Sequence, residues 1–171
     1  PRVVWNTKDL VRSKGGTAVQ AKTGHAFVKQ VMRKSDAVYG GEMSAHHYFR
    51  DFAYCDSGMI PWLVSCELMG RSGEPMSALL AERMAAYPSS GETNFTLQDP
   101  QSSIAAVLGH YEPLSLHKDE TDGMSLEFDN WRFNLRASNT EPVVRLNVES
   151  SGDPDLVAIK LAEIKTLLNS A

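Results

Sequence analysis

Apolar and polar residues alternate strictly in three stretches of the second half of the chain. Residues 124–128, 131–136 and 144–149 each place their apolar side chains on one face. A period of two is typical of β-strands, and the short connections favour antiparallel pairing. The pattern predicts a meander with one apolar and one solvated face, with Arg132 and Arg145 as ordinary solvated strand residues.

A helical period appears on both sides of this meander. Residues 153–169 carry Val157, Leu161, Ile164 and Leu168 on one stripe, which can cover the apolar face of the sheet. Further helices are expected over 100–110, before the meander, and over 25–34, 57–69 and 76–87 in the first half. The second half therefore predicts an α+β domain: a small antiparallel sheet with helices on one side.

The first half alternates short apolar runs with helical patterns. Residues 3–5, 17–21 and 37–39 predict strands, and residues 7–14 predict a helix that ends at Gly15-Gly16. Strands alternating with helices are typical of an α/β layer. The Pro-Ser-Ser-Gly run at 88–91 predicts a linker, and hence one domain over 1–88 and a second over 89–171.

Composition removes several classes of function. The 171 residues are 42% hydrophobic and carry a formal net charge of -4, with no basic stripe of the kind that binds nucleic acid. No apolar run reaches the roughly 18 residues of a membrane-spanning helix. Cys55 and Cys66 form no metal-binding or disulfide pattern, which favours a reducing, cytoplasmic compartment. The start at Pro1, without an initiator Met, is typical of a segment of a larger protein.

Three loops carry candidate chemistry, and the first is Lys22–His25. It lies where predicted strand 17–21 meets predicted helix 25–34. A helix amino terminus attracts anions, Lys22 adds a full charge, and Gly24 lets a ligand approach the backbone. A tight turn with a solvated lysine and a capping His25 is the alternative interpretation.

The second loop, 40–47, follows the predicted strand 37–39. Glu42, Ser44 and His46 alternate, so an extended backbone would point them to one side, where they suit a polyol. Zinc is a further possibility, because Glu and His are both ligands, although the adjacent His46 and His47 would face apart on a strand. A merely polar glycine-rich loop is the third interpretation.

The third loop, 136–142, links two meander strands. Arg136 can grip a phosphate in a bidentate manner, and Ser138, Asn139 and Thr140 add hydroxyl, amide and backbone donors. An ordinary hairpin loop ended by Pro142 is the alternative.

Together, and in this order, these loops resemble the α-D-phosphohexomutase superfamily. The resemblance rests on four runs: Lys-Thr-Gly-His at 22–25, Gly-Glu-Met-Ser-Ala-His at 41–46, Asp-Ser-Gly at 56–58 and Arg-Ala-Ser-Asn-Thr-Glu-Pro at 136–142. Among its members the chain closely resembles bacterial phosphomannomutases of the exopolysaccharide and O-antigen type. The resemblance implies most of the third domain followed by a TATA-binding-protein-like fourth domain, a likeness of fold that implies no DNA binding.

The resemblance also implies roles for individual residues. Glu42 and Ser44 match the family's sugar-specificity loop, and His46 matches a loop histidine near the substrate. Lys22 and His25 match a stretch on the same side of the cleft. The matches to the loop that clamps the non-transferred phosphate are Arg136, Ser138, Asn139 and Thr140. At position 43 the methionine resembles the residue found in mannose and mannose/glucose enzymes. At position 45 the chain has Ala, where many relatives carry Gly.

Two parts of the family's machinery have no match in the sequence. The phosphoserine loop is missing, and so is the acidic loop that holds Mg²⁺, for which the run 119–122 is a poor substitute. The resemblance implies an isomerase that interconverts mannose 6-phosphate and mannose 1-phosphate through a hexose 1,6-bisphosphate, for GDP-mannose and lipopolysaccharide synthesis. We expect this chain alone to be inactive and to supply substrate binding, with the missing N-terminal domains as its partner. A glucose or dual-specificity mutase and a non-catalytic phosphosugar-binding fragment remain the alternatives.

Overall fold

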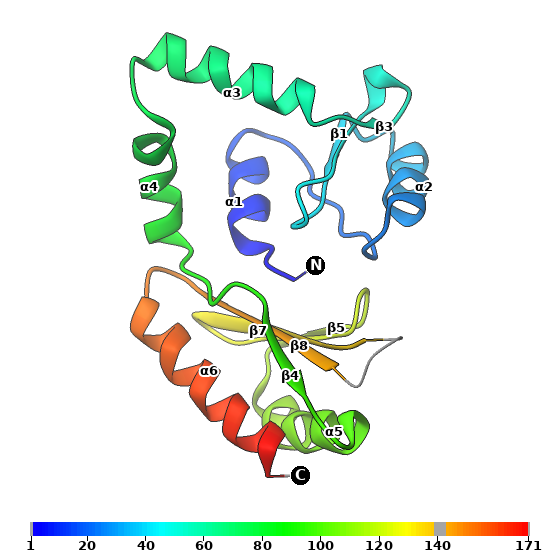
Figure 1. Cartoon of the computed structure of the whole chain (residues 1–171), viewed down its shortest axis with the longest axis vertical. Coiled ribbons are helices and arrows are strands. Elements are labelled where there is room, and N and C mark those ends of the chain that lie inside the picture. The colour runs from blue at the N-terminus through cyan, green and yellow to red at the C-terminus, as the bar shows by residue number, and fades with distance from the viewer. Residues whose placement is uncertain (1, 139–142, 171) are drawn as a thin grey trace. The chain divides into compact units, whose positions relative to one another are not determined.

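The computed structural model describes residues 2–138 and 143–170 (Figure 1). Two compact units form, one from Gln20 to Glu82 and the other from the N-terminal segment up to Val19 together with the chain from Arg83 onward. Among the described residues, no helix has both the length and the apolar character needed to cross a membrane.

The larger unit is built on a five-stranded antiparallel sheet. Its strand order is β4-β8-β7-β6-β5. The strands are β4 (Thr93–Thr96), β5 (His117–Asp119), β6 (Met124–Glu127), β7 (Trp131–Ala137) and β8 (Val143–Ser150). The alternation in the sequence is confirmed in the register, where Phe133 pairs with Val148 and Leu135 with Leu146.

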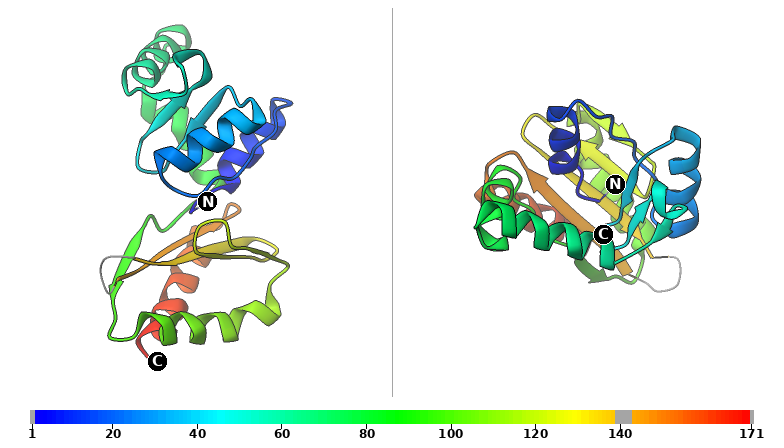
Figure 2. Two further views of the ribbon diagram at one scale, coloured as in Figure 1. Left: turned by 90° about the vertical axis from the view of Figure 1, so that its right-hand side faces the viewer. Right: turned by 90° about the horizontal axis from the view of Figure 1, so that it is seen from above.

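Helices α5 (Pro100–Tyr111) and α6 (Pro154–Asn169) cover one face of this sheet (Figure 2). Each begins with an Asp-Pro pair. The Asp99 side chain accepts from the backbone of Gln101 and Ser102, and Asp153 accepts from Leu156, so both helix starts are capped. The predicted stripe of α6 is buried at Val157, Ile164 and Leu168. The α+β prediction for the second half is therefore confirmed.

The opposite face of the sheet differs from the prediction, because it is polar but buried. Arg132, Asn134 and Glu149 are each at most 1% exposed. Buried charges require partners, and Arg132 Nη1 lies 2.7 Å from Glu149 Oε1. The expectation that Arg132 is a solvated strand residue was wrong, because in this face the charges pair with each other instead of with water.

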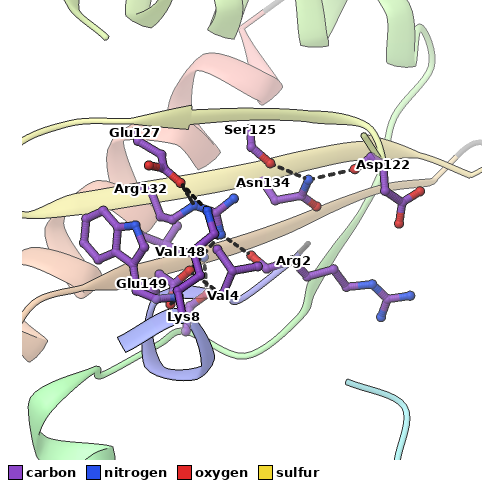
Figure 3. Close-up of polar contacts among 12 residues, drawn as sticks. Arg2, Val4, Lys8, Asp122, Ser125, Glu127, Arg132, Asn134, Val148 and Glu149 are labelled. Carbon is purple, nitrogen blue, oxygen red and sulfur yellow. Dashed lines mark hydrogen bonds and ion pairs between the residues drawn. The ribbon is translucent and has the colours of Figure 1, made fainter. Parts of the chain in front are cut away.

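The N-terminal segment lies on this polar face (Figure 3). The Glu149 carboxylate accepts from the backbone N–H of Val4 at 2.7 Å and of Trp5 at 3.2 Å, and Arg132 donates to the Arg2 carbonyl at 2.8 Å. Helix α1 (Trp5–Ser13) starts at this point, where a carboxylate is favourable for the free N–H groups and the helix dipole.

The strands predicted over 3–5 and 17–21 do not form. The backbone donors of Val4 and Trp5 go to a carboxylate at a helix start, so they are not available for a ladder. Residues 17–21 adopt no regular structure. A β-branched apolar run favours a strand only where a neighbouring strand pairs with it.

The smaller unit packs helix α2 (His25–Ser35) against a three-stranded antiparallel sheet, β1-β2-β3. The strands are β1 (Tyr39–Gly41), β2 (His47–Phe49) and β3 (Cys55–Asp56). Its core consists of Val28 and Met32 from α2 and Tyr48 from β2. Gly40 permits this close approach, since a Cβ there would lie 2.6 Å from the Met32 sulfur.

The remaining helices carry much exposed apolar surface. Helix α3 (Met59–Ser72) and helix α4 (Met76–Ala86) contain no buried residue. Trp62 is 58% exposed and Met84 68%. The helices predicted over 57–69 and 76–87 therefore form, but none of their residues is buried in the described structure.

Candidate functional site

The Glu42–His46 loop connects β1 to β2 as a turn, not as extended backbone. The Ala45 N–H donates to the Glu42 carbonyl at 3.0 Å, and the Glu42 N–H donates to the His46 carbonyl at 2.9 Å. Ala45 has a φ of 63°, a conformation that glycine adopts at less cost. The predicted alternation of Glu42, Ser44 and His46 along an extended strand is therefore wrong, although all three residues belong to the same short loop.

The Glu42 carboxylate joins this loop to the Lys22–His25 loop. Its Oε2 accepts from the backbone N–H of Gly24 at 2.8 Å, and its Oε1 accepts from the Tyr48 hydroxyl at 2.5 Å. The first two candidate loops are thus brought together. Glu42 remains partly exposed, and each oxygen of a carboxylate has two acceptor positions, so it keeps capacity for further donors.

The cationic and polar side chains around Glu42 are open to solvent. Lys22, His25 and Ser44 are exposed, with His25 as the first residue of α2. Lys22 Nζ lies 5.3 Å from the centroid of the Phe27 ring, an arrangement that orients the ammonium group. These side chains can reach a ligand without first breaking a buried contact.

His46 is oriented by a residue to which the sequence gave no role. Its Nδ1 lies 2.6 Å from Asp56 Oδ2, and the His47 N–H donates to Asp56 Oδ1 at 2.9 Å. The hydrogen bond from His46, followed by the one from the His47 backbone, lowers the pKa of Asp56. Because an ionised carboxylate only accepts, the proton lies on Nδ1 and leaves Nε2 of His46 to face a ligand.

Zinc gains no support from this geometry. Across residues 2–138 and 143–170, no group of three or more His, Cys, Asp or Glu side chains is placed to hold a metal ion.

Arg136 lies near the end of β7, in the other unit. Its Nη1 is 3.4 Å from Oδ2 of Asp122, a residue only 4% exposed, and its own side chain is 20% exposed. The Ser138 N–H donates to the Val143 carbonyl at 2.7 Å and closes the hairpin. Asn139 and Thr140 lie outside the described residues.

Arg145 is a candidate that the sequence interpretation missed. It pairs directly with Arg136 across the hairpin, and its Nε is buried without a hydrogen-bond partner in the described structure. Its Nη1 lies 3.7 Å from Oε1 of Glu92. Two like charges directly opposed are unfavourable, so this pair suits an anion. Pairing the two predicted strands from their ends at the loop would place Arg136 opposite Val144, so the sequence alone does not give this contact.

Comparison with known proteins identifies the family. Residues 2–87 match the model for domain III of phosphoglucomutase/phosphomannomutase, the alpha/beta/alpha domain, and residues 92–166 match the model for its C-terminal domain. The chain belongs to the phosphoglucomutase/phosphomannomutase family.

Individual relatives agree with this assignment. A phosphomannomutase from Salmonella montevideo is 58% identical over 170 residues, which cover 99% of this chain and 37% of the relative. A protein named phosphohexose mutases from Xanthomonas campestris is 54% identical, over 98% of this chain and 38% of its own. A crystal structure of a phosphoglucomutase/phosphomannomutase family protein from Burkholderia thailandensis superposes with a TM-score of 0.76 at 29% identity, covering 97% of this chain and 35% of that one. The chain thus spans little more than a third of the length of these relatives.

Proposed function

We propose that this chain supplies sugar recognition and distal-phosphate binding to a phosphomannomutase. The intact protein is then a cytoplasmic isomerase that interconverts mannose 6-phosphate and mannose 1-phosphate for GDP-mannose and surface polysaccharide synthesis. The observation that carries the proposal is the Glu42 carboxylate, which is held by Gly24 and Tyr48 and still has free acceptor positions. The high identity to proteins named phosphomannomutase supports it.

In this proposal Glu42 and Ser44 bind the ring hydroxyls of the hexose. A carboxylate accepts from two vicinal hydroxyls, and a sugar lacking one of them leaves an acceptor unpaired, which gives selectivity. His46, whose Nδ1 is engaged by Asp56, presents Nε2 as its second polar atom. Lys22 and His25 add positive charge on the same side of the substrate.

The proposed phosphate site consists of Arg136, Ser138, Asn139 and Thr140, to which we add Arg145. Arg136 and Arg145 supply two guanidinium groups to one anion, which offsets the repulsion between them. The site grips whichever phosphate is not reacting. A grip on the hydroxyls and on the distal phosphate positions the substrate in both orientations of the bisphosphate intermediate, and positioning is a large part of catalysis.

The chemistry of transfer is assigned to the part of the protein that precedes this chain. The family depends on Mg²⁺, but the described residues do not fit that ion, so no step of the reaction is assigned to a metal here. We keep the division into a third domain over 1–88 and a fourth over 89–171, and we propose that this chain alone is inactive. Nucleic acid and membrane are not among the proposed partners.

A broader hexose specificity is the second candidate, favoured by the relative named phosphohexose mutases. Steady-state kinetics of the intact protein with mannose 1-phosphate and glucose 1-phosphate separate the two. We expect a higher kcat/KM for the mannose ester. A much higher kcat/KM for the glucose ester would contradict the assignment.

A further inference from the structure

We infer that Tyr48 is a positioning residue for sugar recognition, acting through Glu42. The inference rests on the proposed function, because it needs Glu42 to bind the sugar. Tyr48 lies on β2, two residues after the candidate loop, and is 1% exposed. It cannot touch a ligand in solvent, yet its hydroxyl reaches Glu42 Oε1 at 2.5 Å.

The environment of Tyr48 fixes the position of that hydroxyl. Its ring packs in the core with Val28 and Met32, and Lys29 Nζ lies 5.6 Å from the ring centroid. Backbone pairing with Gly40 and Asp56 holds β2 in the centre of its sheet. A buried ring in a central strand has little rotamer freedom, so it directs its hydroxyl to a single point.

The hydroxyl in turn restricts the side-chain conformation of Glu42. A glutamate at the tip of a hairpin has three rotatable side-chain bonds, and a turn alone does not select one rotamer. Here one oxygen is fixed by Tyr48 and the other by the Gly24 N–H. Both donors leave one acceptor position on each oxygen, which is the number needed for two adjacent sugar hydroxyls.

Tyr48 also stays a hydrogen-bond donor to its partner. Burial, followed by the hydrogen bond to Glu42, raises the pKa of Tyr48, so the phenol keeps its proton and remains a donor across the physiological range. Glu42 then receives a hydrogen bond in every state that binds sugar. The carboxylate is ordered before the substrate arrives, which reduces the entropy lost on binding.

The test compares four variants of the intact protein: Tyr48→Phe, Glu42→Ala, the double variant, and Tyr39→Phe as matched control. Tyr39 is a tyrosine on the adjacent strand whose hydroxyl bonds His47 Nδ1 instead of Glu42. KM and kcat for mannose 1-phosphate and the melting temperature are measured for each.

We expect Tyr48→Phe to raise KM roughly five- to tenfold with kcat nearly unchanged, because the lost interaction acts on binding alone. Tyr39→Phe should leave KM within about twofold of wild type. Added to Glu42→Ala, Tyr48→Phe should cause no further rise, because the carboxylate it positions is gone.

The other outcomes distinguish a failure of the Tyr48 inference from a failure of the proposed function. An unchanged KM in Tyr48→Phe, together with a raised KM in Glu42→Ala, refutes positioning by Tyr48 and leaves the proposed function standing. An unchanged KM in Glu42→Ala refutes the proposed function itself. A KM effect of Tyr48→Phe that persists at full size in the Glu42→Ala background shows a purely structural tyrosine, whatever happens to the melting temperature.

Discussion

Single residues of the candidate site have partners that sequence spacing could not indicate. Glu42 and His46 could be selected as candidates because a carboxylate and an imidazole suit a polyol. Their partners Gly24 and Asp56 are 18 and 10 positions away, and the contact with Asp56 depends on the pairing of β2 with β3. Strand β3 has two residues, which is too short for a periodic signal in the sequence.

The Asp56 carboxylate gives a pH-dependent prediction at this scale. Hydrogen bonds from His46 and His47 lower its pKa below the ordinary 3.8, so Asp56 stabilises the folded state above that pH and loses this effect as the pH falls through its lowered pKa. Asp56→Asn should therefore be less stable than wild type at neutral pH, and the difference should shrink in acid. Urea unfolding of both proteins at a series of pH values measures it. A difference that stays constant below the ordinary aspartate value would contradict the assigned hydrogen bonds to an ionised Asp56.

At the scale of elements, the sequence predicted what its periodicity determines. Strands β6, β7 and β8 and helices α2, α5 and α6 lie within a few residues of their expected bounds, because each has a clear period and most have a capping residue or glycine at an end. The short strands β2, β3 and β5 were not predicted. Runs of apolar residues at 3–5 and 17–21 were misassigned, because a strand requires a pairing partner that no single run can reveal.

The polar face of the larger sheet gives a prediction at this scale. Glu149 pairs with Arg132 and accepts two backbone N–H groups, all in a buried setting (Figure 3). Glu149→Leu should lower the free energy of unfolding by about 3–5 kcal/mol, because it removes the carboxylate nearest to the buried Arg132 guanidinium, whose contact with Glu127 is longer, at 3.3 Å. The double variant Glu149→Leu/Arg132→Met should lose less than the single one, since the buried charge is removed together with that carboxylate.

Urea denaturation measures both variants, and an exposed pair supplies the control. Glu67 and Arg71 on α3 form an ion pair with side chains 58% and 80% exposed. Glu67→Gln should change the free energy of unfolding by no more than about 0.5 kcal/mol. A similar small change for Glu149→Leu would show that the buried pair does not hold the N-terminal segment on the sheet.

At the scale of the whole molecule, the proposed substrate contacts come from two sets of residues. Glu42, Ser44 and His46 belong to the unit built on β1-β2-β3, and Arg136 and Arg145 belong to the unit built on the five-stranded sheet. The family resemblance could predict this division, because the four motifs occur in a fixed order. Arg145 was not predicted as a site residue, because its position opposite Arg136 depends on the register of one hairpin.

The most direct test of this division measures two ligands against two variants. Binding of mannose 1-phosphate and of inorganic phosphate to the intact protein is compared by calorimetry for wild type, Glu42→Gln and Arg136→Ala. We expect Glu42→Gln to weaken sugar-phosphate binding about tenfold and leave inorganic phosphate unchanged, and Arg136→Ala to weaken both ligands. Equal losses for both ligands in Glu42→Gln, or a loss confined to the sugar phosphate in Arg136→Ala, would contradict the account.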